Sequence, residues 1–201
     1  MQYLNTSHGT DILEALVDVI VENRNYLSEV DGAIGDGDHG INMAKGFRLC
    51  GESIQGQSLG LSKALGTLAT TLMGSIGGSM GPLYGSLFLG MSNAIKEREA
   101  LDARAFGDML TGGLNALQGI SDAQVGDKCL LDTLVPAVDD YRRAADNGED
   151  FPAALDAFAR VPNAAASPPG SWKPVSVVPP GWANALKATS TPVPSPAGCC
   201  W

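Results

Sequence analysis

The most constraining feature of this chain is a short loop rich in aspartate and glycine. Asp31, Asp36 and Asp38 fall within eight residues, and the last two belong to the run GDGDHG at residues 35–40. Like charges held this close repel one another, so a bound cation would stabilise the cluster. Oxygen ligands alone suit Mg²⁺ or Ca²⁺. The other interpretation is an acidic, solvated turn, because Gly and Asp both favour turns.

The loop also matches G-x-G-x-x-G, but it does not indicate a dinucleotide fold. That fingerprint follows a strand, whereas a helix is expected before this loop, and its two aspartates would repel a bare pyrophosphate. No Walker A lysine follows, and an EF-hand counted from Asp36 would need Gly at Ile41 and Glu at Phe47. The remaining interpretation is a metal-binding loop that leads into a helix N-terminus, and this combination suits a metal-bound polyphosphate.

Apolar residues recur at helical spacing through most of the first 160 residues. The pattern predicts helices over residues 11–27, from 41 onward, 60–73, 82–98, 103–118, 130–146 and 151–160. Thr10 is the expected cap of the first helix, and Asp102 that of the helix over 103–118. No segment before residue 160 alternates convincingly as a strand. We therefore predict an all-α fold with glycine-rich loops near helix ends.

A second glycine-rich stretch, residues 74–85, leads into the helix expected over 82–98. Glycine lets the backbone approach a ligand closely, and Pro82 fits a first helical turn. The stretch is a second candidate for phosphate oxygens, and its other interpretation is a flexible turn with close helix packing at Gly85. The pair Gly112-Gly113 lies inside an expected helix, where it costs stability and indicates close packing or a break.

Composition excludes several classes of function. A chain of 201 residues with 44% hydrophobic residues is large enough for one core. A net charge of −9 argues against nucleic acid or an anionic membrane as partner. No apolar run approaches the ~20 residues of a membrane span. No secretion signal, disulfide framework or zinc spacing is visible, so we expect a cytoplasmic protein.

Three segments together resemble the nucleotide-binding L subunit of dihydroxyacetone kinases: DGAIGDGDHGINM at residues 31–43, GGSMGPLYG at 77–85 and GDKCLLD at 126–132. The resemblance covers residues 10–160, and its motifs occur in the order typical of the family. It implies a nucleotide-binding domain over residues 1–160, built as an antiparallel barrel with the glycine-rich loops and the nucleotide at one end. The family barrel has about eight helices, and the last ones are expected to be missing or disrupted in this chain.

The resemblance also implies the roles of individual residues. Asp31, Asp36 and Asp38 would hold two Mg²⁺ ions that bridge the phosphates of ATP or ADP, and so would serve catalysis. The phosphate region would be lined by His39, Gly40, Ile41, Asn42, Ser79 and Met80. Leu130 and Ser121 would lie near the adenine, although relatives often have Gly where this chain has Ser121.

The function implied is that of a phosphoryl-donor subunit. It would transfer phosphate from Mg-ATP, or from bound ADP rephosphorylated by a phosphotransferase-system protein, to dihydroxyacetone or a related short ketose. The chain starts close to its first expected helix, so the sugar is expected on a separate K subunit. Positioning and charge stabilisation supply most of such catalysis. The alternative is an ADP-binding regulatory protein that engages a transcription regulator without its own catalysis, and a homodimer is left open.

Residues 161–201 depart from the family. They contain nine of the twelve prolines and all three tryptophans, and they lack a family segment resembling G-R-A-S-x-L-G-E-R-S-x-G-H-x-D-x-G-A. Residues 176–197 can be written in codons that spell such a segment in a shifted frame. We therefore predict a frameshift near residue 161 and an aberrant, proline-rich tail. The metal loop would survive, but nucleotide affinity would fall.

Overall fold

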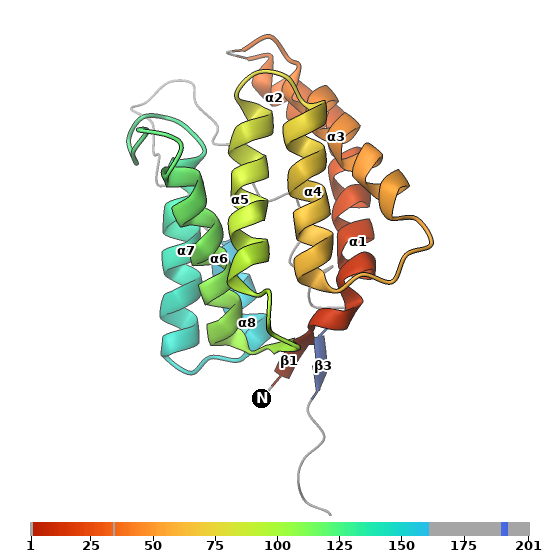
Figure 1. Cartoon of the computed structure of the whole chain (residues 1–201). Helices are drawn as coiled ribbons and strands as arrows, with labels where there is room; N and C mark the ends of the chain where they lie inside the picture. The colour runs from red at the N-terminus through yellow and green to blue at the C-terminus, as the bar shows by residue number, and fades with distance from the viewer. Residues whose placement is uncertain (1, 34, 161–189, 193–201) are drawn as a thin grey trace, which may run out of the picture.

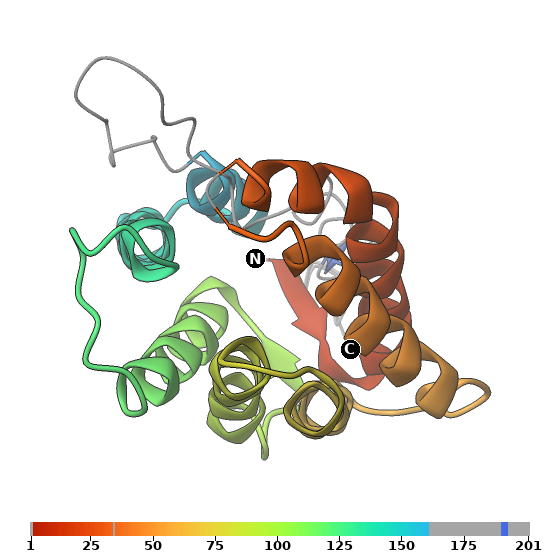
Figure 2. The ribbon, with the colours of Figure 1, turned by 90° about the horizontal axis from the view of Figure 1, so that it is seen from above.

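The computed structural model describes residues 2–33, 35–160 and 190–192. Its helices are α1 (Gly9–Glu22), α2 (Arg24–Asp31), α3 (His39–Ile54), α4 (Leu61–Ser75), α5 (Met80–Ala94), α6 (Ala103–Gln118), α7 (Leu131–Asp146) and α8 (Phe151–Ala159), with a short 3₁₀ helix, η1 (Thr6–His8), before α1. Successive long helices run in opposite directions, and seen along their axes they form a ring (Figures 1 and 2). The all-α prediction is confirmed.

Glycines let the central helices of the ring approach one another closely. A Cβ added to Gly90 on α5 would lie 2.4 Å from the carbonyl oxygen of Gly112 on α6. One added to Gly113 would lie 2.6 Å from Cγ of Met91. Because these sites leave no room for a side chain, Gly112-Gly113 marks close helix packing rather than a break, and α6 continues through both residues.

Aromatic side chains hold the last three helices together. The ring of Phe106 on α6 packs against Tyr141 on α7 and Phe151 on α8, with centroid distances of 5.4 and 5.2 Å. The Tyr141 hydroxyl donates a hydrogen bond of 3.0 Å to the carbonyl oxygen of Ala103 at the start of α6. Tyr141 is fully buried, so this hydrogen bond satisfies a polar group that water cannot reach.

Two expectations for the first helix are wrong. The chain forms α1 and α2 rather than one helix over 11–27, and they meet at Asn23, whose side-chain amide donates to the carbonyl oxygen of Val19 at 2.8 Å. Thr10 does not cap α1. Its hydroxyl donates to the carbonyl of Gln57 and accepts from the N–H of Leu59, both at 2.9 Å, because the connection before α4 folds against it. Asp102 does cap α6, accepting from the Ala105 N–H.

The expectation of no strand before residue 160 is also wrong. Strand β1 (Gln2–Asn5) pairs antiparallel with β2 (Ala100–Leu101), which brings the fully buried Leu4 opposite Leu101. Strand β3 (Ser190–Pro192) pairs with the other edge of β1, at the lower end of Figure 1. Segments this short show no alternating pattern. Apart from residues 190–192, the predicted tail over 161–201 lies outside the described residues.

Candidate functional site

Three connections lie at one end of the ring. The α2–α3, α4–α5 and α6–α7 connections all lie at the top of Figure 1, because successive long helices alternate in direction. The three segments on which the sequence-based site depends, residues 31–43, 77–85 and 126–132, lie in these connections and in the helix ends next to them. The expected gathering of glycine-rich loops at one end is therefore confirmed. Among the described helices, none combines the length and the hydrophobicity that a membrane-spanning segment requires.

The three aspartates meet at this end. Asp31 is the last residue of α2, and Asp36 and Asp38 lie in the connection to α3. One carboxylate oxygen of each lies within 4.8 Å of the others. Oxygens that share one Mg²⁺ are separated by at most about 4.2 Å, because each bond is about 2.1 Å long. Small movements of the two exposed side chains would therefore allow a shared ion, and the all-oxygen donor set fits Mg²⁺.

Glycine makes this arrangement of carboxylates sterically feasible. A Cβ on Gly35 would lie 2.6 Å from Oδ1 of Asp31, and Gly37 has a positive φ of 76°. Backbone N–H groups orient two of the acids: the N–H of His39 donates to Asp31 and that of Asp38 donates to Asp36, both at 3.3 Å. The glycines of the loop therefore serve the packing of carboxylates rather than a dinucleotide.

The start of α3 is pressed against α2. A Cβ on Gly40 would lie 2.0 Å from the carbonyl oxygen of Arg24, so only glycine permits this approach. Asn42 donates its side-chain amide to Oδ2 of Asp38 at 2.7 Å and so orients that carboxylate. Ile41 is 48% exposed and points away from the core. The helix begins at His39 rather than Ile41, which places its first-turn N–H groups beside the acidic cluster, and that of His39 already donates to Asp31.

His39 connects the acidic loop to the second glycine-rich loop. Its Nε2 lies 3.3 Å from the hydroxyl of Tyr84 on α5, and the two rings meet edge to face at 5.9 Å. Burial lowers the pKa of His39, although the nearby Asp31 and Asp38 carboxylates act in the opposite direction. Burial also raises the pKa of Tyr84 to about 12. Tyr84 was not selected as a site residue, although it belongs to the segment GGSMGPLYG.

The second loop leads into α5 two residues before the expected start at Pro82, since α5 begins at Met80. Ser79 is exposed and occupies the N-cap position without a side-chain cap bond, and Met80 is half-buried. A Cβ on Gly81 would lie 2.5 Å from the carbonyl oxygen of Ile76, so the loop turns back tightly on α4. The uncapped N–H groups of this first turn can bind an anion.

The third connection, between α6 and α7, is organised by Asp132. Its carboxylate accepts from the N–H groups of Gly126 and Cys129, both at 2.7 Å, and these bonds lower the pKa of Asp132. Ser121 accepts from the Ala123 N–H at 3.2 Å, and no hydrogen bond of the described residues joins it to the aspartates. Asp132 was not selected as a site residue, although it closes the segment GDKCLLD.

An apolar cavity of about 100 Å³ extends from this end into the ring. Leu130, half-buried just before α7, lines it together with Met43 and Phe47 of α3. Tyr84 lines it as well, so its ring faces the cavity while its hydroxyl faces His39. The structure thus gathers Asp31, Asp36 and Asp38, with His39 bonded to Asp31 and Asn42 bonded to Asp38. The start of α5, with Ser79 and Met80, and the α6–α7 connection, with Ser121 and Leu130, lie at the same end of the ring.

These features define a helical barrel. One end of it holds Asp31, Asp36 and Asp38, which together form an acidic clamp, and the two glycine-rich loops that lead into α3 and α5. Residues 33–170 match the model of the DAK2 domain, and the chain belongs to that family. The expected resemblance to dihydroxyacetone kinase L subunits is confirmed by individual relatives.

The chain is 43% identical over 114 residues to the ADP-binding subunit DhaL of a PTS-dependent dihydroxyacetone kinase from Lactococcus lactis, an alignment that covers 56% of this chain and 57% of the relative. It is 36% identical to the DhaL subunit of PEP-dependent dihydroxyacetone kinase 1 from Listeria innocua, over 59% of this chain and 60% of the relative. These two alignments therefore span less than two thirds of each relative's length.

A longer alignment relates the chain to the ADP-binding subunit DhaL of the PEP-dependent dihydroxyacetone kinase of Escherichia coli, at 32% identity over 74% of this chain and 71% of the relative. The fold is similar to a crystal structure of the dihydroxyacetone kinase from C. freundii in complex with AMP-PNP and Mg²⁺. The TM-score is 0.58 at 22% identity, over 90% of this chain and 32% of that chain, so this likeness concerns the fold.

Proposed function

We propose that this protein is the nucleotide-binding, phosphoryl-donor subunit of a dihydroxyacetone-type kinase. Its site would hold ADP or ATP with Mg²⁺, and its acceptor would be the hydroxyl of dihydroxyacetone or a related short ketose. The acceptor would be held by a separate K subunit. The observation that carries the proposal is the meeting of Asp31, Asp36 and Asp38 beside the N-terminus of α3.

The acidic cluster and the N-termini of α3 and α5 complement each other chemically. Three clustered carboxylates would repel a bare polyphosphate, yet they suit one that carries divalent cations. Two Mg²⁺ ions held by Asp31, Asp36 and Asp38 would neutralise charge on the phosphates. The first-turn N–H groups of α3 and α5 would bind phosphate oxygens, with His39 to Asn42 on one side and Ser79 and Met80 on the other. The described residues supply positioning and charge, which phosphoryl transfer chiefly requires.

The adenine would lie at the α6–α7 connection. Leu130 is half-buried and opens into the apolar cavity beside Tyr84, so it offers an apolar surface next to the phosphate region. Ser121 lies at the other end of the same connection. The bonds from Gly126 and Cys129 to Asp132 hold this connection in shape without help from a ligand.

The names of the relatives favour one of two donor schemes. The Lactococcus lactis protein is a subunit of a PTS-dependent kinase, and the Escherichia coli protein of a PEP-dependent kinase, and both are ADP-binding subunits. We infer that ADP stays bound to this chain and is rephosphorylated by a phosphotransferase-system protein. Exchange of ATP for ADP is the competing scheme. Single-turnover transfer from the pre-phosphorylated donor protein, without free ATP, would distinguish the two.

The tail over residues 161–201 concerns the affinity for the nucleotide rather than the acidic clamp of Asp31, Asp36 and Asp38. Residues 161–201 lack the family-like segment G-R-A-S-x-L-G-E-R-S-x-G-H-x-D-x-G-A. The resemblance implies that the arginine and the Asp-x-Gly-Ala turn of this segment would help to hold the nucleotide. We therefore propose a domain over residues 1–160 with an out-of-frame tail, and weaker ADP binding than in the intact relatives. Sequencing the coding DNA tests this proposal, because a single-base change near codon 161 must restore the segment.

Calorimetric titration with ADP tests the nucleotide site. Binding should require Mg²⁺ and disappear in EDTA. Asp36→Ala should weaken it at least about 100-fold, since loss of even an outer-shell partner costs 10- to 100-fold in metal affinity. Asp18→Ala, a change of an exposed acid on α1, is the matched control. Equal ADP binding with and without Mg²⁺ would refute the clamp.

A transfer assay tests the kinase role separately. The chain, a K subunit and the phosphotransferase donor should together phosphorylate dihydroxyacetone, and Asp36→Ala should abolish turnover. Mg²⁺-dependent ADP binding without transfer to any short ketose would leave the nucleotide site intact but disprove the catalytic role.

A further inference from the structure

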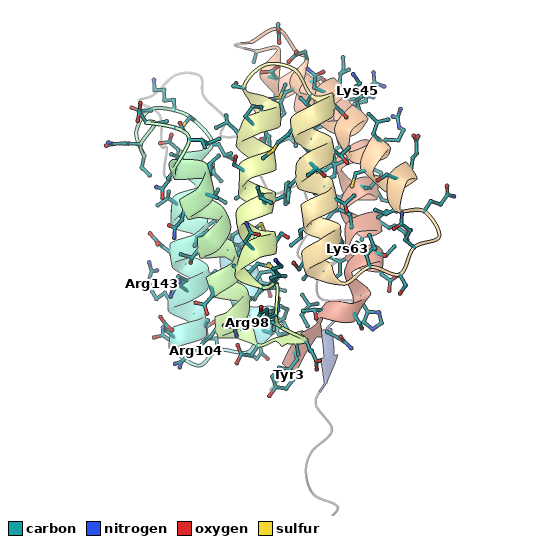
Figure 3. The ribbon with its side chains drawn as sticks, in the orientation of Figure 1. Tyr3, Lys45, Lys63, Arg98, Arg104 and Arg143 are labelled. Atoms are coloured by element: carbon teal, nitrogen blue, oxygen red, sulfur yellow. The ribbon has the colours of Figure 1, made fainter. Side chains whose placement is uncertain are left out.

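A groove with basic side chains lies between α4 and α5, at the end of the ring opposite the three loops. Its volume is about 570 Å³, within the range of small-molecule sites. The first turns of α4 form one wall, and the end of α5 with the segment that follows forms the other. In Figure 3, Lys63 lies beside the lower part of α4 and Arg98 below α5.

The groove has a charge opposite to that of the protein. Lys63, Lys96 and Arg98 line it, and no aspartate or glutamate does. The whole chain has 22 acidic and 13 basic residues, so an average surface of this protein would be negative. A concave surface with basic residues alone concentrates positive potential and attracts anions.

Ordinary helix electrostatics accounts for only part of this cluster. Lys96 and Arg98 follow the C-terminal end of α5, where cations are favourable in any helix. Lys63 lies in the first turn of α4, where the helix dipole disfavours a cation. Among the described residues neither lysine forms an ion pair, whereas Arg98 lies 3.7 Å from Asp108. Two ammonium groups are therefore available to an anionic ligand.

Backbone donors add to these cations. Gly60 precedes α4 and supplies no side-chain cap, and the first helical bond runs from the Ala64 N–H to the Gly60 carbonyl at 2.9 Å. The N–H groups of Ser62 and Lys63 consequently have no partner within the helix. Unpaired N–H groups at a helix start, combined with lysine, form the kind of site that binds phosphate groups.

The two walls of the groove are fixed to each other. The Ser62 hydroxyl donates to the carbonyl of Ser92 at 2.9 Å, and the Ser92 hydroxyl donates to the carbonyl of Ser62 at 2.7 Å. These reciprocal bonds join α4 to α5, so a ligand would not need to order the groove before binding. Preformed walls reduce the entropic cost of binding.

We propose that this groove binds the phosphate group of a small anion, at a site separate from the nucleotide end. The inference stands independently of the kinase proposal, because it uses none of the same residues. The phosphate group could belong to free phosphate or to a phosphate monoester. The volume of the groove favours a monoester, whose organic part would extend along Thr67 and Thr70 on α4.

Titration of the ¹⁵N-labelled full chain tests the proposal, with glycerol 3-phosphate and inorganic phosphate as separate probes and glycerol as the uncharged control. EDTA is present throughout, so that the acidic clamp cannot bind phosphate through a metal. Both anions should shift the amide signals of Ser62, Lys63 and Lys96, and the ester should bind more tightly. Equal affinities would identify the phosphate ion itself as the ligand and would still support the site.

Substitutions decide whether the groove is responsible. Lys63→Ala and Lys96→Ala should each raise the dissociation constant about tenfold, because each removes a charge-assisted bond. Lys45→Ala, a change of an exposed lysine on α3, should leave it unchanged. The absence of any shift at residues 62, 63 and 96, or undiminished affinity in a folded Lys63→Glu/Lys96→Glu variant, would overturn the proposal.

Discussion

The Tyr84 hydroxyl lies 3.3 Å from Nε2 of His39, and this contact connects the N-terminal parts of α5 and α3. Forty-five positions separate the two residues, so the contact is purely tertiary. His39 also donates its backbone N–H to Asp31, so His39 links the tyrosine to the acidic cluster. These contacts fix the positions of the two glycine-rich loops relative to each other at one end of the barrel.

The first prediction concerns this contact. Tyr84→Phe keeps the ring that lines the apolar cavity but removes the hydrogen bond to His39. A single hydrogen bond contributes about 0.5–1.5 kcal/mol, so the dissociation constant for ADP with Mg²⁺ should rise about 2- to 10-fold. Isothermal calorimetry measures the change. Tyr26→Phe, at an exposed tyrosine of α2, is the control, and equal affinities of the two variants would argue against a role for Tyr84.

The second prediction distinguishes two roles of Asp36, repulsion of the neighbouring carboxylates and metal binding. Asp36→Asn removes one of three carboxylates that lie within 4.8 Å of one another. Without metal, the free energy of unfolding at low ionic strength should rise by at most about 1 kcal/mol, because like charges at this distance repel weakly through water. With Mg²⁺, ADP binding should be lost. Urea denaturation in EDTA and calorimetry measure the two effects, and a fall in metal-free stability would contradict the repulsion argument.

The third prediction concerns pH and the α6–α7 connection. The N–H groups of Cys129 and Gly126 hold the pKa of Asp132 below its ordinary value of 3.8. A carboxyl whose pKa is lower in the folded state stabilises the fold at pH values above 3.8, and this contribution is lost as pH falls through the folded pKa. Asp132→Asn should therefore be less stable than wild type at pH 7, and the difference should narrow in acid.

Thermal melting at several pH values measures that difference. Asp122→Asn is the matched control, since Asp122 is an exposed aspartate of the same connection. A stability difference between wild type and Asp132→Asn that stays constant down to the acid limit would mean that charge is not the cause.

The fourth prediction tests the close approach of α5 and α6. Gly90→Ala would place a methyl group 2.4 Å from the Gly112 carbonyl oxygen and 2.6 Å from the Cβ of Ala116. Overpacking should lower the free energy of unfolding by about 1–3 kcal/mol, although alanine favours helices. Gly74→Ala on α4 meets no atom within 4 Å and should be neutral or slightly stabilising. Similar urea midpoints for both variants would contradict the packing argument.

Much of this molecule could be predicted from its sequence, because helical periodicity and turn chemistry are local properties. The helix over 103–118 with its Asp102 cap was predicted at the residues where it occurs. The acidic loop was also predicted, since Gly35 and Gly37 permit the turns that bring the carboxylates together. The specific roles of the site residues stay predictions, because they depend on a bound nucleotide.

Other features depended on residues distant in the sequence. Thr10 is a suitable cap, yet it binds the backbone of Gln57 and Leu59 because the α3–α4 connection folds over it. Strand β1 exists because Ala100 and Leu101 lie beside it, and four residues alone show no strand pattern. The basic groove likewise forms only where the start of α4 meets the end of α5.

By itself, the sequence determined that the chain is helical and that three carboxylates cluster around one connection, because spacing of a few residues settles both. The tertiary structure alone decided that Tyr84 reaches His39 and that Asp132 closes the α6–α7 connection. It also decided that Lys63, Lys96 and Arg98 line a single groove. These relationships arise from the packing of antiparallel helices, which brings together residues that no local pattern connects.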